Sequence, residues 1–250
     1  MPKLVGVLAD IHGDLQALDA ALARLRDMGC DAILCAGDLI DMEPFSEGVI
    51  QRLKGEEGLI CIAGNHERWA LDRRHRQKDM RSFFEPCHIS DYFGGGAELS
   101  RDSLAWLATL PTHWDGELEG VRVAMWHARP GSDMEGIEKE IIGPKLRHHL
   151  LEQAHADVLI VGHTHTEFEL LVNVLHAKIL NPGACCSKTH AFKQVGSLAV
   201  PEGFRPATFA VLELPEMRFK VFQALNGERV FGTVPDRSCI STKPSKRTGG

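Results

Sequence analysis

The first third of the chain alternates short apolar runs with segments whose apolar residues recur every three or four positions. The apolar runs are rich in Val, Leu and Ile, which is typical of strands covered on both faces. They predict strands at Lys3–Ala9, Ala32–Ala36 and Gly58–Ala63. With helices between them, the order β-α-β-α-β implies parallel strands joined by right-handed crossovers.

The first predicted helix has clear boundary signals. Asp14 can cap its N-terminus, and Gly29 is a natural stop at its C-terminus. Its apolar face is formed by four leucines, Leu15, Leu18, Leu22 and Leu25. Two further helices are expected, at Phe45–Leu53 and from His66 to about Met80. We therefore expect each of the first three strands to be followed by a helix.

The rest of the chain is less regular. Its expected elements are a helix at Ser100–Leu110, a hairpin or two strands within Glu117–Trp126, a helix from about Ile137 to Gln153 and a strand at Asp157–Val161. The last part, Phe168–Gln223, holds several short strands, including Ala207–Leu214 and Arg218–Ala224, and it suggests a second sheet. From about Gly232 onward the chain is polar. We expect one domain over residues 1–231 and a disordered tail over residues 232–250.

Composition and charge narrow the class of protein. The 250 residues are 44% hydrophobic and 25% charged, which is typical of a soluble globular protein. The formal net charge of −6 argues against a dedicated nucleic-acid binder, which would carry a basic surplus. It leaves a nucleotide substrate possible, since bound metal ions can dominate the local field.

The seven cysteines are irregularly spaced and form no CxxC pair, so a structural zinc site has no support. We interpret the adjacent Cys185 and Cys186 as packing residues rather than ligands. No stretch approaches the roughly 18 apolar residues of a membrane span, and the N-terminus does not resemble a signal peptide. Cytoplasmic localisation is therefore expected.

Polar motifs follow five of the predicted strands at their carboxyl ends. They are DIHGD with Asp10 and His12, GDLID with Asp38 and Asp41, GNHE with Asn65 and His66, a lone His127, and GHTH with His163 and His165. Ligands bind at this edge of an α/β sheet. Each motif alone has a simpler explanation as a turn, a helix start or a half-buried histidine. Five such motifs, each directly after a predicted strand, favour a common metal-binding or ligand-binding site.

The residue types in this set are metal ligands. In Asp10-x-His12 and His163-x-His165, residues i and i+2 of an extended segment point the same way and can reach one ion. Seven candidates are too many for one ion: Asp10, His12, Asp38, Asn65, His127, His163 and His165. Two ions about 3.5–4 Å apart could share them, with Asp38 as the bridge.

In this order the motifs resemble those of the calcineurin-like metallophosphoesterase superfamily, and Asn181-Pro182-Gly183 resembles the NPG of its small bacterial branch. The resemblance covers roughly residues 3–223. It implies a four-layer α/β/β/α fold of two packed mixed sheets flanked by helices. It also implies two ligand sets: Asp10, His12, Asp38 and His165 for one ion, and Asp38, Asn65, His127 and His163 for the other.

The resemblance also implies catalytic roles. His66 matches the catalytic histidine, which acts as a general acid or as a donor to the transition state, and Asp41 matches the carboxylate that orients it. A metal-bridging hydroxide would attack the phosphorus in line. Asn65 and His66 would also contact the substrate, and Arg129 is a further candidate for a phosphate contact.

Departures from the family pattern bear on substrate. Protein phosphatases and symmetrical diadenosine tetraphosphatases of the superfamily carry GDxxDRG, whereas Met42 occupies the arginine position here. A basic stretch follows GNHE, with Arg68, Arg73, Arg74, His75, Arg76, Lys78 and Arg81. It is either a solvated helix face or a basic wall for further phosphates. Trp69 and Trp126 could stack on a base, although buried packing is the simpler interpretation.

The leading hypothesis is a metal-dependent phosphatase or phosphodiesterase with two divalent ions, drawn from Mn, Fe, Zn and Ni. Its substrate would be a small phosphoester, such as a nucleotide or a dinucleoside polyphosphate. The alternatives are a non-catalytic scaffold of the same fold and a nuclease-type phosphodiesterase. We expect no membrane association and no nucleic-acid partner, and a homo-oligomer remains open.

Overall fold

The computed structural model describes residues 3–72, 99–172, 175–187, 190–195 and 198–225. Its first sheet has five strands in the order β12-β11-β1-β2-β3. The strands are β1 (Lys3–Leu8), β2 (Ala32–Cys35), β3 (Leu59–Cys61), β11 (Thr208–Leu214) and β12 (Arg218–Gln223). β1, β2 and β3 are parallel, whereas β11 is antiparallel to β1 and β12. The three parallel strands predicted from the N-terminal third are therefore confirmed.

The second sheet also has five strands among the described residues, in the order β4-β5-β6-β8-β7. They are β4 (His113–Leu118), β5 (Val121–Trp126), β6 (Val158–Ile160), β7 (Phe168–Val172) and β8 (Ala177–Asn181). β5, β6 and β8 are parallel, and the two outer strands are antiparallel to their neighbours. Both sheets are therefore mixed.

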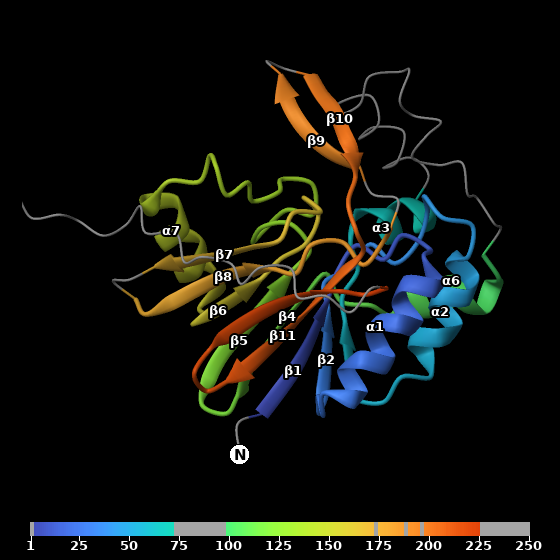
Figure 1. The fold of residues 1–250 in the computed structure, drawn as a ribbon, viewed down its shortest axis with the longest axis horizontal. Helices are drawn as coiled ribbons and strands as arrows, with labels where there is room; N and C mark the ends of the chain where they lie inside the picture. Colours follow the sequence, from blue (N-terminus) through green and yellow to red (C-terminus); the bar gives the residue numbers. More distant parts are fainter. Residues whose placement is uncertain (1–2, 73–98, 173–174, 188–189, 196–197, 226–250) are drawn as a thin grey trace, which may run out of the picture.

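The two sheets pack face to face between helices, which confirms the four-layer fold (Figure 1). α1 (Leu15–Asp27), α2 (Ser46–Lys54) and α6 (Arg101–Leu107) lie on the side of the first sheet, and α7 (Pro144–Ala154) on that of the second. Three apolar clusters correspond to the three interfaces. The cluster between the sheets includes Val5, Leu34 and Ala210 from the first and Val123, Val158 and Ile160 from the second.

Side chains at the helix ends explain the helix boundaries. The Asp14 carboxylate accepts a 2.9 Å hydrogen bond from the main-chain N–H of Ala17 and so caps α1. Gly29 follows the helix with φ of +77°, a left-handed conformation that favours glycine. Ser100 caps α6 in the same way as Asp14 caps α1, through the N–H of Ser103. α3 (Asn65–Leu71) starts immediately at the GNHE motif.

Two expectations were wrong. The helix predicted from Ile137 begins only at Pro144, because Pro144 lacks the N–H that a helix interior requires and Gly143 takes the N-cap position. Of the strands expected to form a second sheet over Phe168–Gln223, β7 and β8 do belong to one, but those near residues 207–224 do not. β11 pairs with β1 from Lys3↔Leu214 to Val7↔Ala210, so these strands extend the first sheet instead. The second sheet begins with the β4–β5 hairpin.

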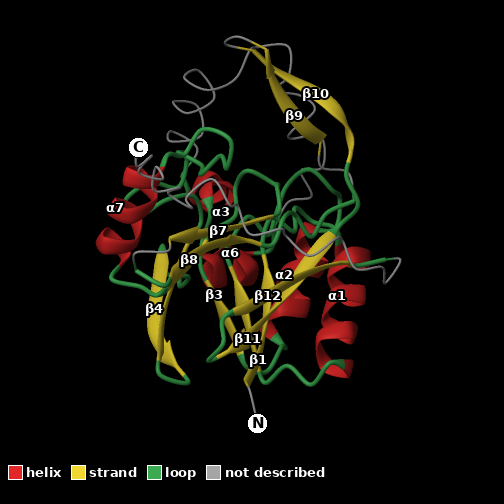
Figure 2. Ribbon diagram, turned by 60° about the vertical axis from the view of Figure 1, so that its left-hand side comes forward, coloured by secondary structure: helices red, strands yellow, loops and turns green. Residues whose placement is uncertain are grey.

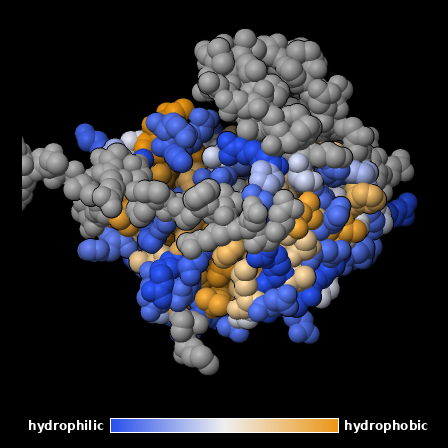
Figure 3. Space-filling model, in the orientation of Figure 1, coloured by the Kyte–Doolittle hydropathy of each residue, from blue (hydrophilic) through white to orange (hydrophobic). Residues whose placement is uncertain are grey.

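A two-stranded sheet of β9 (His190–Val195) and β10 (Leu198–Phe204) rises from the body of the molecule (Figure 2). On the face shown in Figure 3, the described surface is mostly hydrophilic with small apolar areas. The described residues contain no helix long and apolar enough to cross a membrane. The part of the third predicted helix beyond residue 72 and the predicted tail at residues 232–250 lie outside the described residues.

Candidate metal centre

The polar motifs meet where the carboxyl ends of the parallel strands of both sheets converge. Three loops come from the first sheet and two from the second, and main-chain hydrogen bonds tie them together. Asp10 N–H donates to the Gly37 carbonyl at 3.0 Å, and Gly162 N–H donates to the His127 carbonyl at 2.7 Å. Across the sheets, Cys185 N–H donates to the Ala9 carbonyl at 2.9 Å. The seven ligand candidates are therefore brought together.

Six of the functional candidates have a left-handed backbone, with φ between 47° and 70°: Asp10, His12, Asp38, Asp41, His163 and His165. The expectation that Asp10-x-His12 and His163-x-His165 are extended was therefore wrong. Main-chain hydrogen bonds impose the conformation on the first loop, where Ile11 and His12 N–H both donate to the Asp38 carbonyl at 2.7 and 3.0 Å. Non-glycine residues with this conformation concentrate at functional sites.

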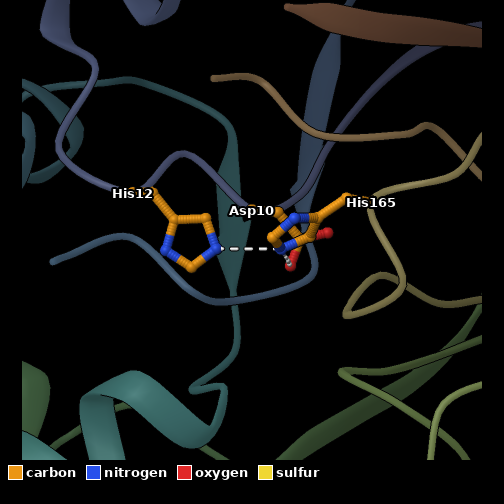
Figure 4. A group of neighbouring side chains, drawn as sticks. All are labelled: Asp10, His12 and His165. Carbon is orange, nitrogen blue, oxygen red and sulfur yellow. Dashed lines mark hydrogen bonds and ion pairs between the residues drawn. The ribbon is translucent and has the colours of Figure 1, made fainter. Parts of the chain in front are cut away.

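The first group of candidate ligands consists of Asp10, His12 and His165 (Figure 4). Nε2 of His12 lies 3.0 Å from Nε2 of His165, which in turn lies 3.7 Å from Oδ1 of Asp10. Asp38 adjoins this group, because its Oδ2 lies 3.8 Å from Nε2 of His12. Asp10, His12 and Asp38 are buried, with exposed fractions of 2% or less.

The second group consists of Asp38, His127 and His163. Nε2 of His127 lies 3.2 Å from both Oδ2 of Asp38 and Nδ1 of His163. The Asn65 amide lies 3.0 Å from His127 Nε2 and 3.1 Å from His163 Nδ1. The side-chain oxygen of Asn65 faces the two imidazoles, so the lone pairs of this oxygen, His127 Nε2 and His163 Nδ1 point to the same position. Asp38 is the carboxylate that adjoins both groups.

The geometry of both groups suits divalent cations. Around an ion with bonds of about 2.1 Å, neighbouring ligand atoms lie roughly 3 Å apart, close to the separations seen here. Two histidines are also held in the tautomer that a metal requires. Nδ1 of His12 donates to the Ile40 carbonyl at 3.1 Å, and Nδ1 of His127 donates to the Ala36 carbonyl at 2.7 Å. Both Nε2 atoms are thereby left free to face the groups.

The electrostatics of the groups also favour a cation. Burial and the charge of Asp38 raise the pKa of Asp10 to about 8. Burial lowers the pKa of His127, but the charge of Asp38 and the hydrogen bond with it outweigh burial and raise that pKa to about 10. Burial lowers the pKa values of His12 and His163 to about 4. Positive charge is therefore favoured beside Asp38, where a metal ion would displace the protons of Asp10 and His127, while the imidazoles of His12 and His163 are neutral and able to coordinate the ion.

His66 and Asp41, the predicted catalytic pair, lie beside the groups. Nδ1 of His66 donates to Oδ2 of Asp41 at 2.8 Å, and Nε2 lies 3.9 Å from Oδ2 of Asp38. Although burial lowers the pKa of His66, the charge of Asp38 and the hydrogen bond to Asp41 outweigh it and raise that pKa. Trp69 is buried and packs against the His66 ring with centroids 4.7 Å apart, in accord with the packing interpretation.

Sequence reasoning missed the role of Glu67, the last residue of GNHE. Its buried carboxylate accepts three main-chain hydrogen bonds, from Gly64 at 2.8 Å, Asp38 at 2.9 Å and Leu39 at 2.8 Å. It thus joins the start of α3 to the loop that carries Asp38. Burial and the charge of Asp38 raise its pKa to about 7. The available signal was a glutamate three residues after the N-cap position, as in a capping box.

Asn181 was noted only as part of the NPG resemblance, and the structure gives it a structural role. Its side-chain N–H donates to the Gly162 carbonyl at 2.9 Å and to the Thr164 hydroxyl at 3.2 Å. Its side-chain oxygen accepts from Gly183 N–H at 2.8 Å. Asn181 therefore fixes the loop that carries His163 and His165.

The candidates for substrate contacts have diverse surroundings. Arg129 pairs with Glu135. Trp126 stacks on His113 with ring centroids 4.3 Å apart, which again indicates packing.

In the basic stretch, Arg68 pairs with Asp133, and the other members lie outside the described residues: Arg73, Arg74, His75, Arg76, Lys78 and Arg81. Cys185 and Cys186 are fully buried, as expected of packing residues.

The family model of the calcineurin-like phosphoesterase superfamily domain matches residues 4–214. The chain therefore belongs to this superfamily, which confirms the resemblance of its motifs. Two similar solved structures share the fold. A hypothetical protein from Pyrococcus horikoshii has a TM-score of 0.68 at 17% identity, covering 88% of this chain and 87% of its own. A metallophosphoesterase from Sphaerobacter thermophilus has a TM-score of 0.63 at 19% identity, and the match covers 88% of this chain and 86% of the Sphaerobacter chain.

Curated relatives match over shorter stretches. An uncharacterized protein from Methanocaldococcus jannaschii is 22% identical over 66% of this chain and 64% of its own length. A symmetrical bis(5'-nucleosyl)-tetraphosphatase from Paracidovorax citrulli is 32% identical over 46% of this chain and 42% of its own. Serine/threonine-protein phosphatase 1 from Salmonella typhimurium is 41% identical over 28% of this chain and 32% of its own length. The chain thus spans less than two thirds of the length of each of these relatives.

Proposed function

We propose that the protein is a phosphoric ester hydrolase that works with two divalent metal ions. The observation that carries the proposal is the position of Asp38, whose Oδ2 lies 3.8 Å from His12 Nε2 in one ligand group and 3.2 Å from His127 Nε2 in the other. A carboxylate between two groups of nitrogen and oxygen donors is suited to hold a pair of ions.

Each ion would be held by four residues, with Asp38 in both sets. Asp10, His12, Asp38 and His165 would hold the first, and Asp38, Asn65, His127 and His163 the second. Mixed imidazole and oxygen donors suit Mn, Fe, Zn and Ni. When bound, the ions would bind phosphoryl oxygens and lower the pKa of a water molecule that attacks the phosphorus.

His66 would assist the departure of the leaving group. Its Nδ1 is engaged by Asp41, so the proton available to a substrate is on Nε2, the atom that faces Asp38. Because the neighbouring carboxylates raise the pKa of His66, the imidazole is more often protonated near neutral pH and can donate to a departing oxygen. Asp41 holds the ring in this orientation.

For the substrate we propose a small phosphoester, with nucleotides and dinucleoside polyphosphates as the first class to test. Support comes from the similarity to a protein named symmetrical bis(5'-nucleosyl)-tetraphosphatase, although Met42 replaces the arginine of the GDxxDRG motif. Arg129 lies in the loop after His127, and exchange of Glu135 for a phosphate would let it contact the substrate. Asn65 would contact the same phosphate beside His66.

The test is a substrate panel with the purified chain, loaded in turn with Mn, Fe, Zn and Ni. The panel should contain chromogenic phosphomonoesters and phosphodiesters, nucleotides, dinucleoside polyphosphates and single-stranded DNA. We expect hydrolysis of at least one small phosphoester, and about two metal ions per chain by elemental analysis. No hydrolysis with any metal would overturn the proposal. Inactivity together with the absence of copurifying metal would favour a non-catalytic scaffold. Selective cleavage of DNA would favour a nuclease.

A further inference from the structure

A bidentate ion pair joins the two halves of the candidate site. Nε of Arg68 donates to Oδ2 of Asp133 at 2.5 Å, and a terminal nitrogen donates to Oδ1 at 3.1 Å. The two side chains are 29% and 33% exposed, so the pair lies at the rim of the buried groups. Two parallel hydrogen bonds between a guanidinium and a carboxylate fix the relative orientation of the two side chains as well as their separation.

Arg68 belongs to the helix that presents two site residues. α3 runs from Asn65 to Leu71, and Arg68 is one helical turn beyond Asn65 and two residues beyond His66. The helix is too short to hold its direction by itself. Glu67 anchors its first turn to the first sheet. Arg68 points to the other side of the site, toward the loop that follows β5 of the second sheet.

The loop that carries Asp133 is itself well defined. Arg129 and Ser132 exchange two main-chain hydrogen bonds around Pro130-Gly131, and Gly131 has the φ of +86° that such a turn requires. The Ser132 hydroxyl then accepts hydrogen bonds from the N–H groups of Met134 and Glu135 at 3.2 and 3.0 Å. Asp133 is therefore held between two anchored residues and faces Arg68 from a fixed position.

The same loop touches the second ligand group. It starts directly after His127, and the atom of the Asn65 amide that faces His127 and His163 also lies 3.3 Å from the main-chain oxygen of Asp133. The pair thus adjoins ligand candidates from both sheets.

We propose that Arg68 and Asp133 are positioning residues that align α3 with the loops of the second sheet. The pair would hold the Asn65 amide beside His127 and His163, at 3.0 and 3.1 Å, and would keep His66 in place beside a bound phosphoester. This inference rests on the proposed function. The competing explanation is that Arg68 binds a substrate phosphate and that Asp133 only occupies it in the free protein.

Single and double variants separate the two explanations. In Arg68→Met, Asp133→Asn and the double variant, positioning predicts that kcat falls by roughly ten- to a hundredfold with KM little changed. The double variant should be no worse than the poorer single variant, because both remove one interaction. The control is Arg122→Met, which removes a bidentate pair with Asp157 at the opposite end of β5, at 3.0 and 2.6 Å, and should leave kcat unchanged.

A second measurement does not depend on activity. Hydrogen–deuterium exchange of the metal-free protein should be faster at residues 65–71 in both single variants than in the wild type and in Arg122→Met. Unchanged exchange there, or unchanged kcat where the wild type is active, would overturn the inference. A raised kcat/KM in Asp133→Asn with a raised KM in Arg68→Met would assign Arg68 to substrate binding instead. If the wild type hydrolyses nothing, the proposed function fails, and exchange alone decides whether the pair aligns α3.

Discussion

The carboxylate of Asp41 accepts a 2.8 Å hydrogen bond from Nδ1 of His66. This bond and the buried ring of Trp69 hold the imidazole with Nε2 toward Asp38, 3.9 Å away. Neither Asp41 nor His66 belongs to the proposed ligand sets. His66 lies close enough to His12 and Asp38 to form a third candidate ligand group, so the proposed separation of metal-binding residues from residues that act on the leaving group has to be tested by substitution.

Replacing His66 by Ala should reduce turnover without removing metal. A general acid or transition-state donor contributes roughly 10²- to 10⁴-fold to a rate, so kcat should fall within that range. Elemental analysis of the same preparation should still find about two ions per chain. Asp41→Asn should give a smaller loss of kcat, because the imidazole remains. Loss of metal from His66→Ala would contradict the separation of roles.

Replacing Asp38 by Ala should abolish the dinuclear centre, because this carboxylate adjoins both ligand groups. Elemental analysis and a metal titration followed by calorimetry should show loss of both tight sites. His127→Ala provides the comparison, because this residue belongs to the second group alone and its removal should leave the first ion bound. Two tightly bound ions in Asp38→Ala would exclude Asp38 as the bridge.

Replacing Glu67 by Gln should destabilise the metal-free protein. Its two carboxylate oxygens accept N–H groups from Gly64, Asp38 and Leu39, and an amide presents only one oxygen to them. A buried N–H left facing another donor costs about 1–3 kcal/mol, which denaturant unfolding at pH 8 can measure. The exposed Glu57→Gln is the matched control. Equal stability of the two variants would refute this role.

Glu47 should make folding sensitive to acid. Hydrogen bonds from the main-chain N–H of Ser100 and from the side chains of Ser103, Gln51 and Ser100 lower the pKa of Glu47 from 4.5 to about 2. A lowered folded pKa contributes stability above the unfolded value, and that stability is lost as the pH falls toward the folded value.

The advantage of the wild type over Glu47→Gln in free energy of unfolding should therefore shrink between about pH 4.5 and about pH 2. Urea unfolding at several pH values measures the difference. A difference that stays constant over this range would show that the charge of Glu47 makes no contribution.

Much of this architecture follows from local sequence signals. Apolar runs identified β1, β2 and β3, and the cap at Asp14 together with Gly29 predicted the limits of α1 within one or two residues. Because the motifs directly follow strands, their convergence at one edge could also be anticipated. Residues close to these signals were therefore predicted well.

The errors concern partners that are distant in sequence. The residues of β11 and those next to it in the sequence carry no signal that it pairs with β1 rather than with a strand of another sheet. The left-handed backbone of Asp10 and His12 arises from hydrogen bonds that Ile11 and His12 N–H donate to the Asp38 carbonyl, 27 and 26 positions later in the chain. The partners of Glu67 and Arg68 likewise come from other loops. Such contacts depend on tertiary packing, which no local window contains.

The position of β11 has a consequence for folding during synthesis. β1 lies between β2 and β11, so one edge of the strand that leads into Asp10 has no partner until residues 208–214 have left the ribosome. An unpaired apolar strand edge is prone to join other chains. A nascent chain that stalls before β11 would therefore be vulnerable to aggregation through the open edge of β1.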